Sequence, residues 1–367
     1  MPKLETITIK GYKSIADLED FALNDLNVIV GANGAGKSNF ISFFRLLRSF
    51  MQGGLDAYVI DQGGADDMLH NGVKHTSRME FKVMFGERGY EFNLSPTMTA
   101  TLYSSYEARY YSKATHDWWV LNNQHSSESA MAKEATGDSY DARYSKPVYD
   151  AIMAWEVYHF HDTSNTAAMR RAEIVEDNAR LRWNASNIAP YLLNLKNNHP
   201  EVYRQIVDVV RFVLPVFDDF LLLPQPMGPK TIVKLGWTQK GSDFPMQTYH
   251  LSDGTIRFIC LATALLQHKL PSTIVLDEPE LGLHPAAIGI LAELIKAAAT
   301  RTQVIVATQS PLLLDYFSAE DIIVATHKGG ASHFSRLDAE SLRGWLEEYT
   351  LGELWVKNVI EGGPQYV

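Results

Sequence analysis

One glycine-rich segment of this sequence combines residue types that can hold a phosphate group. Residues 31–38 fit the pattern G-x-x-x-x-G-K-[ST], and those expected to contact a nucleotide are Gly31, Asn33, Gly34, Ala35, Gly36, Lys37 and Ser38. The glycines let backbone N–H groups converge on an anion, and the dipole of a following helix adds partial positive charge. In this pattern the lysine reaches the β- and γ-phosphates, and the serine hydroxyl is a ligand of Mg²⁺. The segment predicts a nucleoside triphosphate site, and the alternative is a glycine-rich turn that binds nothing.

Two adjacent carboxylates follow an apolar run farther along the chain. Residues 273–276 form that run, and Asp277 and Glu278 come next. An acid at the C-terminal end of a buried strand lies at the crevice where α/β folds bind ligands. Asp277 would hold Mg²⁺, directly or through water, and Glu278 would act as general base on the attacking water. Apolar strands that end in aspartate are common, so the pattern depends on the phosphate-binding segment for its meaning.

A third segment, residues 251–255, precedes a predicted helix over residues 256–267. Ser252 is a suitable N-cap, and Gly254 lets the backbone approach an anion. By itself the segment fits an ordinary capped helix. Its place shortly before the strand that ends at Asp277 favours a part in the same site.

The elements around these segments predict an α/β core. A strand over 26–30 and a helix over 39–47 flank the glycine-rich loop. The last third alternates strand and helix, with predicted elements at 272–276, 286–299, 303–307 and 321–325. These strands are largely apolar, as is typical of parallel strands buried on both faces.

Other parts of the chain predict a β layer and a helical region. Alternating or β-rich runs at 6–10, 78–85, 90–94, 99–111 and 117–121 favour an antiparallel sheet. Residues 126–146 predict a long surface loop or a partly disordered insert, because they are polar and aperiodic. Residues 150–220 predict mostly helix, including one helix with Asn198 as N-cap that ends at Pro215. The absence of sustained heptads between Ser38 and Leu251 argues against a long coiled coil.

The composition limits the partners of the chain. Its 367 residues contain 33 Lys and Arg against 43 Asp and Glu, a formal charge of −10, which disfavours strong autonomous DNA binding. The basic group Arg170, Arg171, Arg180 and Arg182 is interpreted as a solvated helix face. The single Cys260 lies in an apolar run and fits a reducing cytosol. Neither a signal peptide nor an apolar stretch of membrane-spanning length is present, so a cytoplasmic protein without membrane contact is expected.

His159 and His161 share one face if residues 158–162 form a strand. A metal site would need further ligands, and none is evident nearby. A role in polar packing or hydrogen bonding is therefore the favoured interpretation.

The order of these segments, together with 276–279, 282–285 and 307–311, resembles an ABC-type ATPase head. More narrowly, the sequence resembles the RecF- and SMC-like predicted ATPases, relatives of the ATPase half of the overcoming-lysogenization-defect nucleases. Asn33 and Asn39 favour this group over transporter subunits. Residues 9–15 and 351–355 also match it, so the resemblance touches both ends of the chain.

The resemblance implies roles for particular residues. The segment 251–255, with Ser252, Asp253 and Gly254, corresponds to the ABC signature, which binds the γ-phosphate of ATP held by a second subunit. Residues 280–284 correspond to the D-loop, which passes between subunits, and Gln309 takes the switch position, where many relatives have histidine. Gln62 is the candidate Q-loop glutamine at the metal, although a plain turn residue is an equal alternative. Lys13 is a candidate phosphate ligand, with an exposed strand-end lysine as the alternative.

Two departures from the common ABC pattern affect the expected rate of ATP hydrolysis. The signature has Asp253 where glycine is commonest and Thr255 where glutamine is, and an acid beside a γ-phosphate repels it unless the side chain turns away. Gln309 can donate a hydrogen bond but cannot become a cation. Slow or partner-dependent hydrolysis is therefore expected.

The resemblance also implies the fold class and the assembly: an α/β ABC-type P-loop ATPase head with an antiparallel β layer and a helical insertion. We expect residues 1–100 to form the first part of the core, 101–231 a β and helical insertion lobe, and 232–367 the part with signature, Walker B strand and switch. Two chains, or a higher oligomer, would face each other head to tail around ATP and Mg²⁺.

Three functions compete at this point. The favoured one is a switch that controls a separate effector, such as a nuclease or toxin in phage defence. It is favoured because the chain leaves no room for a Toprim nuclease domain and is acidic. The second is a DNA-repair ATPase acting on DNA ends or structures. The third, a transporter ATPase subunit, is disfavoured by Asn33 and the non-standard signature.

Overall fold

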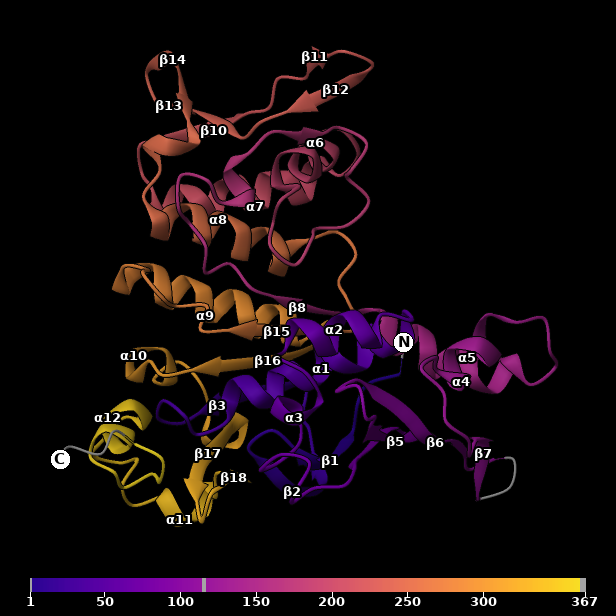
Figure 1. The fold of residues 1–367 in the computed structure, drawn as a ribbon. Coiled ribbons are helices and arrows are strands. Elements are labelled where there is room, and N and C mark those ends of the chain that lie inside the picture. The colour runs from indigo at the N-terminus through magenta and orange to yellow at the C-terminus, as the bar shows by residue number, and fades with distance from the viewer. Residues whose placement is uncertain (1, 114–116, 364–367) are drawn as a thin grey trace.

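The central element is a six-stranded sheet in the order β18-β17-β3-β16-β15-β8. The computed structural model describes residues 2–113 and 117–363, and Figure 1 shows this sheet in the middle of the molecule. Five of its strands are parallel, and β18 is an antiparallel edge strand. The strands in sheet order are β18 (Ala331–Arg336), β17 (Ile322–Lys328), β3 (Leu26–Val30), β16 (Gln303–Thr308), β15 (Thr273–Asp277) and β8 (Trp155–Tyr158).

Alternate residues of these strands enter two separate apolar cores. Val28 and Leu276 pack with helices α8 (Asp253–Leu266) and α9 (Pro285–Ala299) on one face. Ile29 and Val275 pack on the other face with α1 (Lys37–Met51), which contributes four phenylalanines, Phe40, Phe43, Phe44 and Phe50. The sheet is thus covered on both sides, which is why its strands are apolar runs and the sequence prediction of a parallel core is confirmed.

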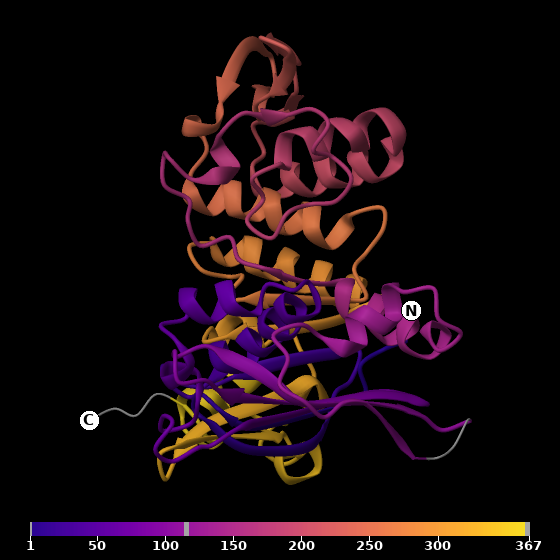
Figure 2. The same ribbon diagram turned by 45° about the vertical axis from the view of Figure 1, so that its right-hand side comes forward.

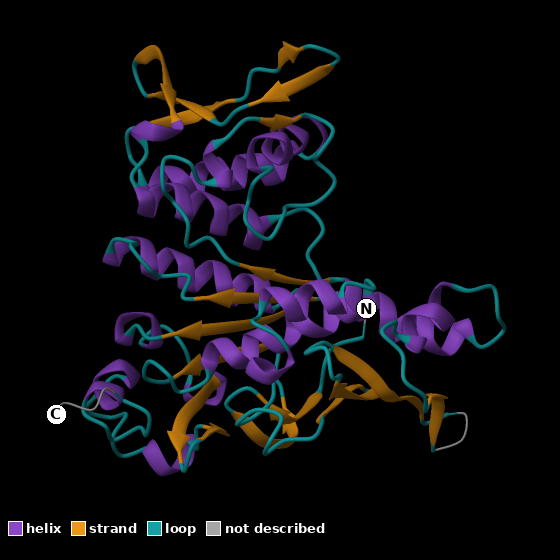
Figure 3. Ribbon diagram, viewed as in Figure 1, coloured by secondary structure: helices purple, strands orange, loops and turns teal. Residues whose placement is uncertain are grey.

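A second six-stranded sheet lies below the central one in Figures 1 and 3, and its order is β2-β1-β4-β5-β6-β7. Its strands are β1 (Thr6–Tyr12), β2 (Ile15–Ala22), β4 (Met79–Phe85), β5 (Arg88–Pro96), β6 (Leu102–Tyr111) and β7 (Trp118–Asn122). All neighbours in it are antiparallel. It shares the phenylalanine-rich core of α1, where Phe81 stacks on Phe92. The short helices α2 (Leu55–Asp61) and α3 (Ala65–Met68) connect α1 to β4. The predicted antiparallel layer is confirmed.

The prediction of a loop over residues 126–146 is wrong, because this segment forms α4 (Ala130–Thr136) and the start of α5 (Ala142–Met153). A buried carboxylate holds α4 in place. Glu107 on β6 accepts hydrogen bonds from the hydroxyl groups of Tyr90, Ser104 and Ser129 and from the backbone N–H groups of Ala130 and Met131. A carboxylate satisfies the free N–H groups and the dipole of a helix start, and this partner lies too far away in the sequence to be seen as a local pattern.

The prediction of mostly helix over residues 150–220 is only partly right. β8 adds an edge strand to the central sheet, and only α6 (Ile188–Asn198) and α7 (Pro200–Val213) are long helices beyond α5. The N-cap of α7 is His199, one residue after the predicted position. A four-residue apolar strand carries no period long enough to separate it from helix. The division of the chain at residues 100 and 231 stays a prediction.

An upper lobe in Figures 1 and 2 consists of α6, α7 and α8 with short strands above them. Two three-stranded sheets, β10-β13-β14 and β11-β12-β9, form its tip. Their strands are β9 (Glu173–Ile174), β10 (Phe217–Leu221), β11 (Gln225–Met227), β12 (Lys230–Val233), β13 (Gly236–Gln239) and β14 (Ser242–Gln247).

The C-terminal helices close the opposite side of the molecule. They are α10 (Pro311–Leu314), α11 (Ala339–Leu342) and α12 (Leu351–Val356). Gly352 on α12 lies so close to the backbone carbonyl of Pro311 that a Cβ atom would collide with it, and its N–H donates to Asp315 at 2.7 Å. Within the described ranges, no helix has both the length and the apolar character needed to cross a membrane.

Candidate nucleotide-binding site

The glycine-rich loop joins the end of β3 to the start of α1, as the sequence predicts. Gly34 and Gly36 have φ values of 80° and 103°, a left-handed conformation that a glycine adopts without strain. A Cβ atom at Gly36 would also collide with the side chain of Ser332 on β18. The loop therefore keeps its shape because these two positions are glycine.

Lys37 holds its ammonium group inside this loop. Its Nζ donates to the carbonyl oxygens of Gly31 at 2.6 Å and Ala32 at 3.1 Å. Burial lowers the pKa of Lys37, while the carboxylates of Glu278 and Asp277 act in the opposite direction. Ser38 and Asn33 are exposed next to it, so their side chains are open to a ligand.

Three acidic residues lie at the same edge of the sheet: Asp277 ends β15, and Glu278 and Glu280 follow it. Burial raises the pKa of Asp277, with a further increase from the neighbouring charge of Glu278. Glu278 has a φ of 43°, and a non-glycine residue in this region is strained by about 1–3 kcal/mol, typically at functional sites. Its Oε1 accepts a hydrogen bond from Nε2 of Gln309. The predicted base and the predicted switch residue are therefore in direct contact.

The oxygen donors at this edge fit a magnesium ion. Mg²⁺ prefers hard oxygen ligands and commonly takes one or two carboxylates together with phosphate oxygens and water. The Asp277 carboxylate, whose raised pKa a cation would lower, and the exposed Ser38 hydroxyl are such donors. In the described part of the chain, no three His, Cys, Asp or Glu side chains group as metal ligands, so any ion here would complete its shell from the nucleotide and from water.

Glu280 is a site residue that the sequence analysis included only as a D-loop position. It is buried, and its Oε1 accepts from the hydroxyl of Thr308 at 2.5 Å and from the N–H of Gln309 at 3.4 Å. Burial raises its pKa. Glu280 thus fixes the backbone of the switch segment relative to the D-loop, and the only local signal for it was a third acid after Asp277 and Glu278.

His161 takes the hydrogen-bonding role that the sequence predicts, whereas His159 packs beside it and its buried Nδ1 has no hydrogen-bond partner among the described residues. Their rings lie 4.1 Å apart, and Nε2 of His161 lies 2.9 Å from the carbonyl oxygen of Asp277. Burial and the neighbouring His161 lower the pKa of His159 to about 4. A neutral His159 fits packing beside β15.

The signature segment starts α8 as predicted. Ser252 caps the helix by accepting from the N–H of Thr255 at 3.1 Å. Gly254 has a second role, because a Cβ atom there would collide with the carbonyl oxygen of Gly282 in the D-loop. Arg257, one turn on, donates to the carbonyl oxygens of Leu281 and of Phe160 and His161. The sequence analysis missed Arg257, since its partners are backbone atoms of distant segments.

Arg170 is the second residue that the sequence analysis misjudged. It is buried, not on a solvated helix face, and its Nη2 lies 2.9 Å from Oδ1 of Asp253. Its other N–H groups donate to the carbonyl oxygens of Thr163 and Thr248. The unusual acid of the signature therefore has a counter-ion within its own chain, which reduces the repulsion expected between Asp253 and a γ-phosphate.

Lys13 and Gln62 come together beside the phosphate loop. Nζ of Lys13 donates to Oε1 of Gln62 at 2.8 Å, and Asn39 donates to Ser14 at 2.7 Å. These four residues line one cavity of about 500 Å³ together with Asp66 and Asp67. The cavity adjoins α1 at Asn39 and is large enough for a nucleoside.

The signature stands apart from the other predicted site residues. Across the described residues, no hydrogen bond or ion pair links segment 251–255 to the phosphate loop at 31–38. Figures 1 and 2 show α8 in the upper lobe, with α9 between it and the central sheet. One chain therefore carries a phosphate cradle with acids and switch at one place, and an exposed signature at another.

This fold and site define a P-loop ATPase head of the SMC/RecF-like type. The chain belongs to the family described as "AAA domain, putative AbiEii toxin, Type IV TA system", whose profile matches residues 26–315. That span begins at the first residue of β3 and ends one residue after α10. It includes the phosphate loop, the signature segment, the acids at residues 277–280 and Gln309. No curated protein matches the sequence.

Solved structures with a similar fold are Smc head domains. One, the SmcHead bound to the C-winged helix domain of ScpA, is 16% identical with a TM-score of 0.55, over 94% of this chain and 100% of that one. Another, the Smc head domain with an extended coiled coil from Pyrococcus furiosus, bound to the C-terminal domain of ScpA, has the same identity and TM-score over 95% and 99%. At this identity the likeness establishes the fold, and it confirms the predicted fold class.

The Arg170–Asp253 pair yields a prediction about charge at the signature. Arg170→Met keeps most of the side-chain volume but leaves Asp253 without its counter-ion. We expect kcat/KM for ATP to fall about tenfold, equivalent to about 1.4 kcal/mol of transition-state stabilisation. The measurement is phosphate release by the full chain at constant ionic strength.

A second substitution separates charge from packing. Arg170→Met combined with Asp253→Asn should recover most of the lost activity, because the uncompensated charge is gone. The exposed neighbour Arg171 provides the control, and Arg171→Met should leave the rate unchanged. Failure of Asp253→Asn to restore any activity would show that Arg170 acts only through the loop carbonyls it holds.

Proposed function

We propose that this chain hydrolyses ATP with Mg²⁺ in composite sites between two copies facing head to tail, and that its nucleotide state controls a separate effector protein. The observation that carries the proposal is the contact between Glu278 and Gln309 beside the Lys37 loop. A carboxylate aligned by a hydrogen-bond donor, next to a phosphate cradle, suits activation of water for attack on a γ-phosphate.

The residues of this chain would divide the reaction as follows. Glu278 accepts the proton of the attacking water, and the amide of Gln309 holds that carboxylate in place. Lys37 leaves the loop carbonyls of Gly31 and Ala32 and stabilises the β- and γ-phosphates. Asp277 and Ser38 would hold Mg²⁺, which would neutralise phosphate charge. Gln62 would contact the metal ion, and Lys13, which donates to Gln62, would help to bind phosphate.

The separation of the signature from the cradle supports dimerisation. Ser252 and Asp253 are exposed on α8, and their own chain offers them no phosphate. A second copy turned head to tail would bring the hydroxyl of Ser252 to the γ-phosphate held by Lys37. The D-loop, packed against Gly254 and held by Arg257, would lie at the same interface.

Two observations support the proposed control of an effector: the net charge of the chain and the description of its family. The formal charge of −10 disfavours tight DNA binding by the chain alone, and the family description refers to toxin systems. Because Gln309 cannot carry positive charge, we expect slow turnover that a partner accelerates, in the manner of a switch. Anti-phage defence in the cytoplasm is the setting that suits such a switch. Direct action on DNA ends is the alternative, and a transporter subunit is a weaker one.

The role of Glu278 as general base is tested by Glu278→Gln. The amide keeps the shape and the contact with Gln309 but cannot accept a proton, so kcat should fall by about 10²–10⁴. ATP affinity, measured by equilibrium dialysis, should persist. Glu293→Gln on the exposed face of α9 is the matched control, and normal turnover by Glu278→Gln would remove Glu278 from this role.

Composite sites are tested by mixing two inactive variants. Lys37→Ala disables its own cradle, and Ser252→Arg blocks the γ-phosphate of the partner. A mixed dimer keeps one intact site, so ATPase activity should return when the two are combined. Lys37→Ala mixed with Glu278→Gln is the control and should stay inactive, because both changes lie in the cradle. Activity that fails to return at every ratio would contradict sites formed between subunits.

Effector control and direct action on DNA predict different behaviour of the purified chain. Under effector control, DNA affinity should be weak and should fall steeply with salt, with no nuclease activity in Mg²⁺ or Mn²⁺. The product of a neighbouring gene, co-expressed with the chain, should bind it in one nucleotide state only. Tight DNA binding together with ATPase activity stimulated by DNA ends would instead establish the repair function.

A further inference from the structure

A cavity of about 600 Å³ lies between α1, α2, the start of β8 and the loop at residues 180–183. Four arginines line it: Arg45, Arg48, Arg180 and Arg182. The carboxylates of the lining are Glu156 and Asp61, which leaves an excess of positive charge. In a chain with a formal charge of −10, such an excess is unusual and marks a place where an anion can approach.

The arginines differ in how far their charge is already neutralised. Arg48 makes two hydrogen bonds to Glu156, at 2.6 and 3.0 Å, and Arg180 reaches the same carboxylate only at 3.9 Å. Arg182 pairs with Asp177, outside the lining, at 2.8 Å. Arg45 has no ion pair among the described residues, and its Nη2 is buried without a hydrogen-bond partner. Arg45 is therefore a lining cation whose charge no carboxylate of the described residues balances through an ion pair.

Two aromatic rings complete the lining. Trp183 is 53% exposed, and its loop is fixed because its carbonyl oxygen accepts from the N–H of His159 at 2.9 Å. Tyr58 is held by a hydrogen bond to the carbonyl oxygen of Ser42 at 3.1 Å. Aromatic rings beside arginines are the combination that binds nucleobases by stacking and phosphates by charge. The volume exceeds what a phosphate group alone would fill.

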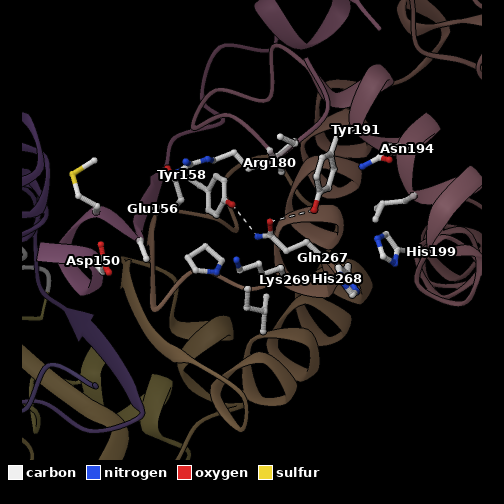
Figure 4. A pocket seen from close by; sticks show the side chains of 17 residues that line it. Asp150, Glu156, Tyr158, Arg180, Tyr191, Asn194, His199, Gln267, His268 and Lys269 are labelled. Carbon is white, nitrogen blue, oxygen red and sulfur yellow. Dashed lines mark hydrogen bonds and ion pairs between the residues drawn. The ribbon is translucent and has the colours of Figure 1, made fainter. Parts of the chain in front are cut away.

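A neighbouring cavity of about 460 Å³ continues this surface. The two share Glu156 and Arg180, and the second adds Lys269 and the stacked rings of His199 and His268, whose centroids are 3.6 Å apart. Figure 4 shows Glu156 and Arg180 toward one end and His199 toward the other, with Gln267 bridging Tyr158 and Tyr191 between them. A ligand longer than one nucleotide would find further basic groups along this path.

We propose that the cavity lined by Arg45, Arg180 and Trp183 binds a nucleoside phosphate, separately from the ATP cradle. The phosphate lies against Arg45 and Arg180, and the base lies against Trp183. Gln62 borders both this cavity and the one beside Lys13, so the two sites adjoin without sharing the phosphate loop. The proposal goes beyond ATP hydrolysis and does not depend on it.

Binding is tested on the full chain carrying Lys37→Ala, which disables the ATP cradle. The probes are thymidine 5′-monophosphate, a 5′-phosphorylated oligothymidylate and inorganic phosphate, followed by calorimetry and by tryptophan fluorescence. We expect the nucleotide probes to bind and to quench fluorescence. Binding of both nucleotide probes with equal affinity assigns the site to free nucleotides, and binding of the oligonucleotide alone assigns it to a strand end. If inorganic phosphate binds as tightly as either nucleotide probe, the proposal that the cavity recognises the nucleoside is wrong.

Variants connect the binding to the named residues. Arg45→Met with Arg180→Met should weaken nucleotide binding about a hundredfold, at about tenfold for each charge-assisted contact removed. Trp183→Leu should abolish the quenching. Arg343→Met, at an exposed arginine far from the cavity in sequence, is the control and should change nothing. If the double variant fails to fold, Arg180→Met alone must weaken binding, since Arg180 is exposed. Absence of binding by the nucleotide probes, or affinity unchanged by these variants, refutes the site whatever the ATPase activity proves to be.

Discussion

Hydrogen bonding between the parallel strands β3, β16 and β15 fixes the relative positions of the phosphate loop, the acids at Asp277 and Glu278, and Gln309. In this register Val30 pairs with Thr308, and Asp277 pairs with Ala307. The chain therefore leaves all three strands at the same edge, where the phosphate loop, Gln309 and Glu278 follow. A shift of one residue would turn the side chains of a strand to the opposite face, and the two apolar cores on either side of the sheet oppose any such shift.

Contacts between backbone and side-chain atoms connect this edge of the sheet to the signature segment at residues 251–255. Gly254 permits the D-loop to approach α8, Arg257 holds Leu281 and the segment after β8, and Glu280 holds the switch segment. The acids at residues 277–280, the predicted D-loop and the start of α8 are thus linked by direct contacts.

The cations near the two sites differ in whether a carboxylate already balances their charge. Arg170 is committed to Asp253, and Arg48 to Glu156. Lys37 is held by loop carbonyls beside three acids, and Arg45 lacks an ionic partner within the described residues. These two cations lie on the same helix, α1, one at its start and one two turns later. Helix α1 therefore presents one positive group to the ATP cradle and another to the arginine-lined cavity.

The sequence by itself determined the elements whose information is local. The glycine-rich loop between strand and helix, the acids after β15 and the Ser252 cap are contiguous patterns, because dihedral freedom, a helix dipole and capping act over a few residues. The alternation of apolar residues likewise determined the two kinds of sheet. Only the tertiary structure decided the pairing of Arg170 with Asp253 and the burial of Glu280. It also decided the hydrogen bonds from Arg257 to the D-loop and the helix at residues 130–136, whose first N–H groups donate to Glu107. Each of these contacts depends on a partner distant in the chain. The type of a residue alone does not reveal whether its charged group is exposed to water or paired with a buried group.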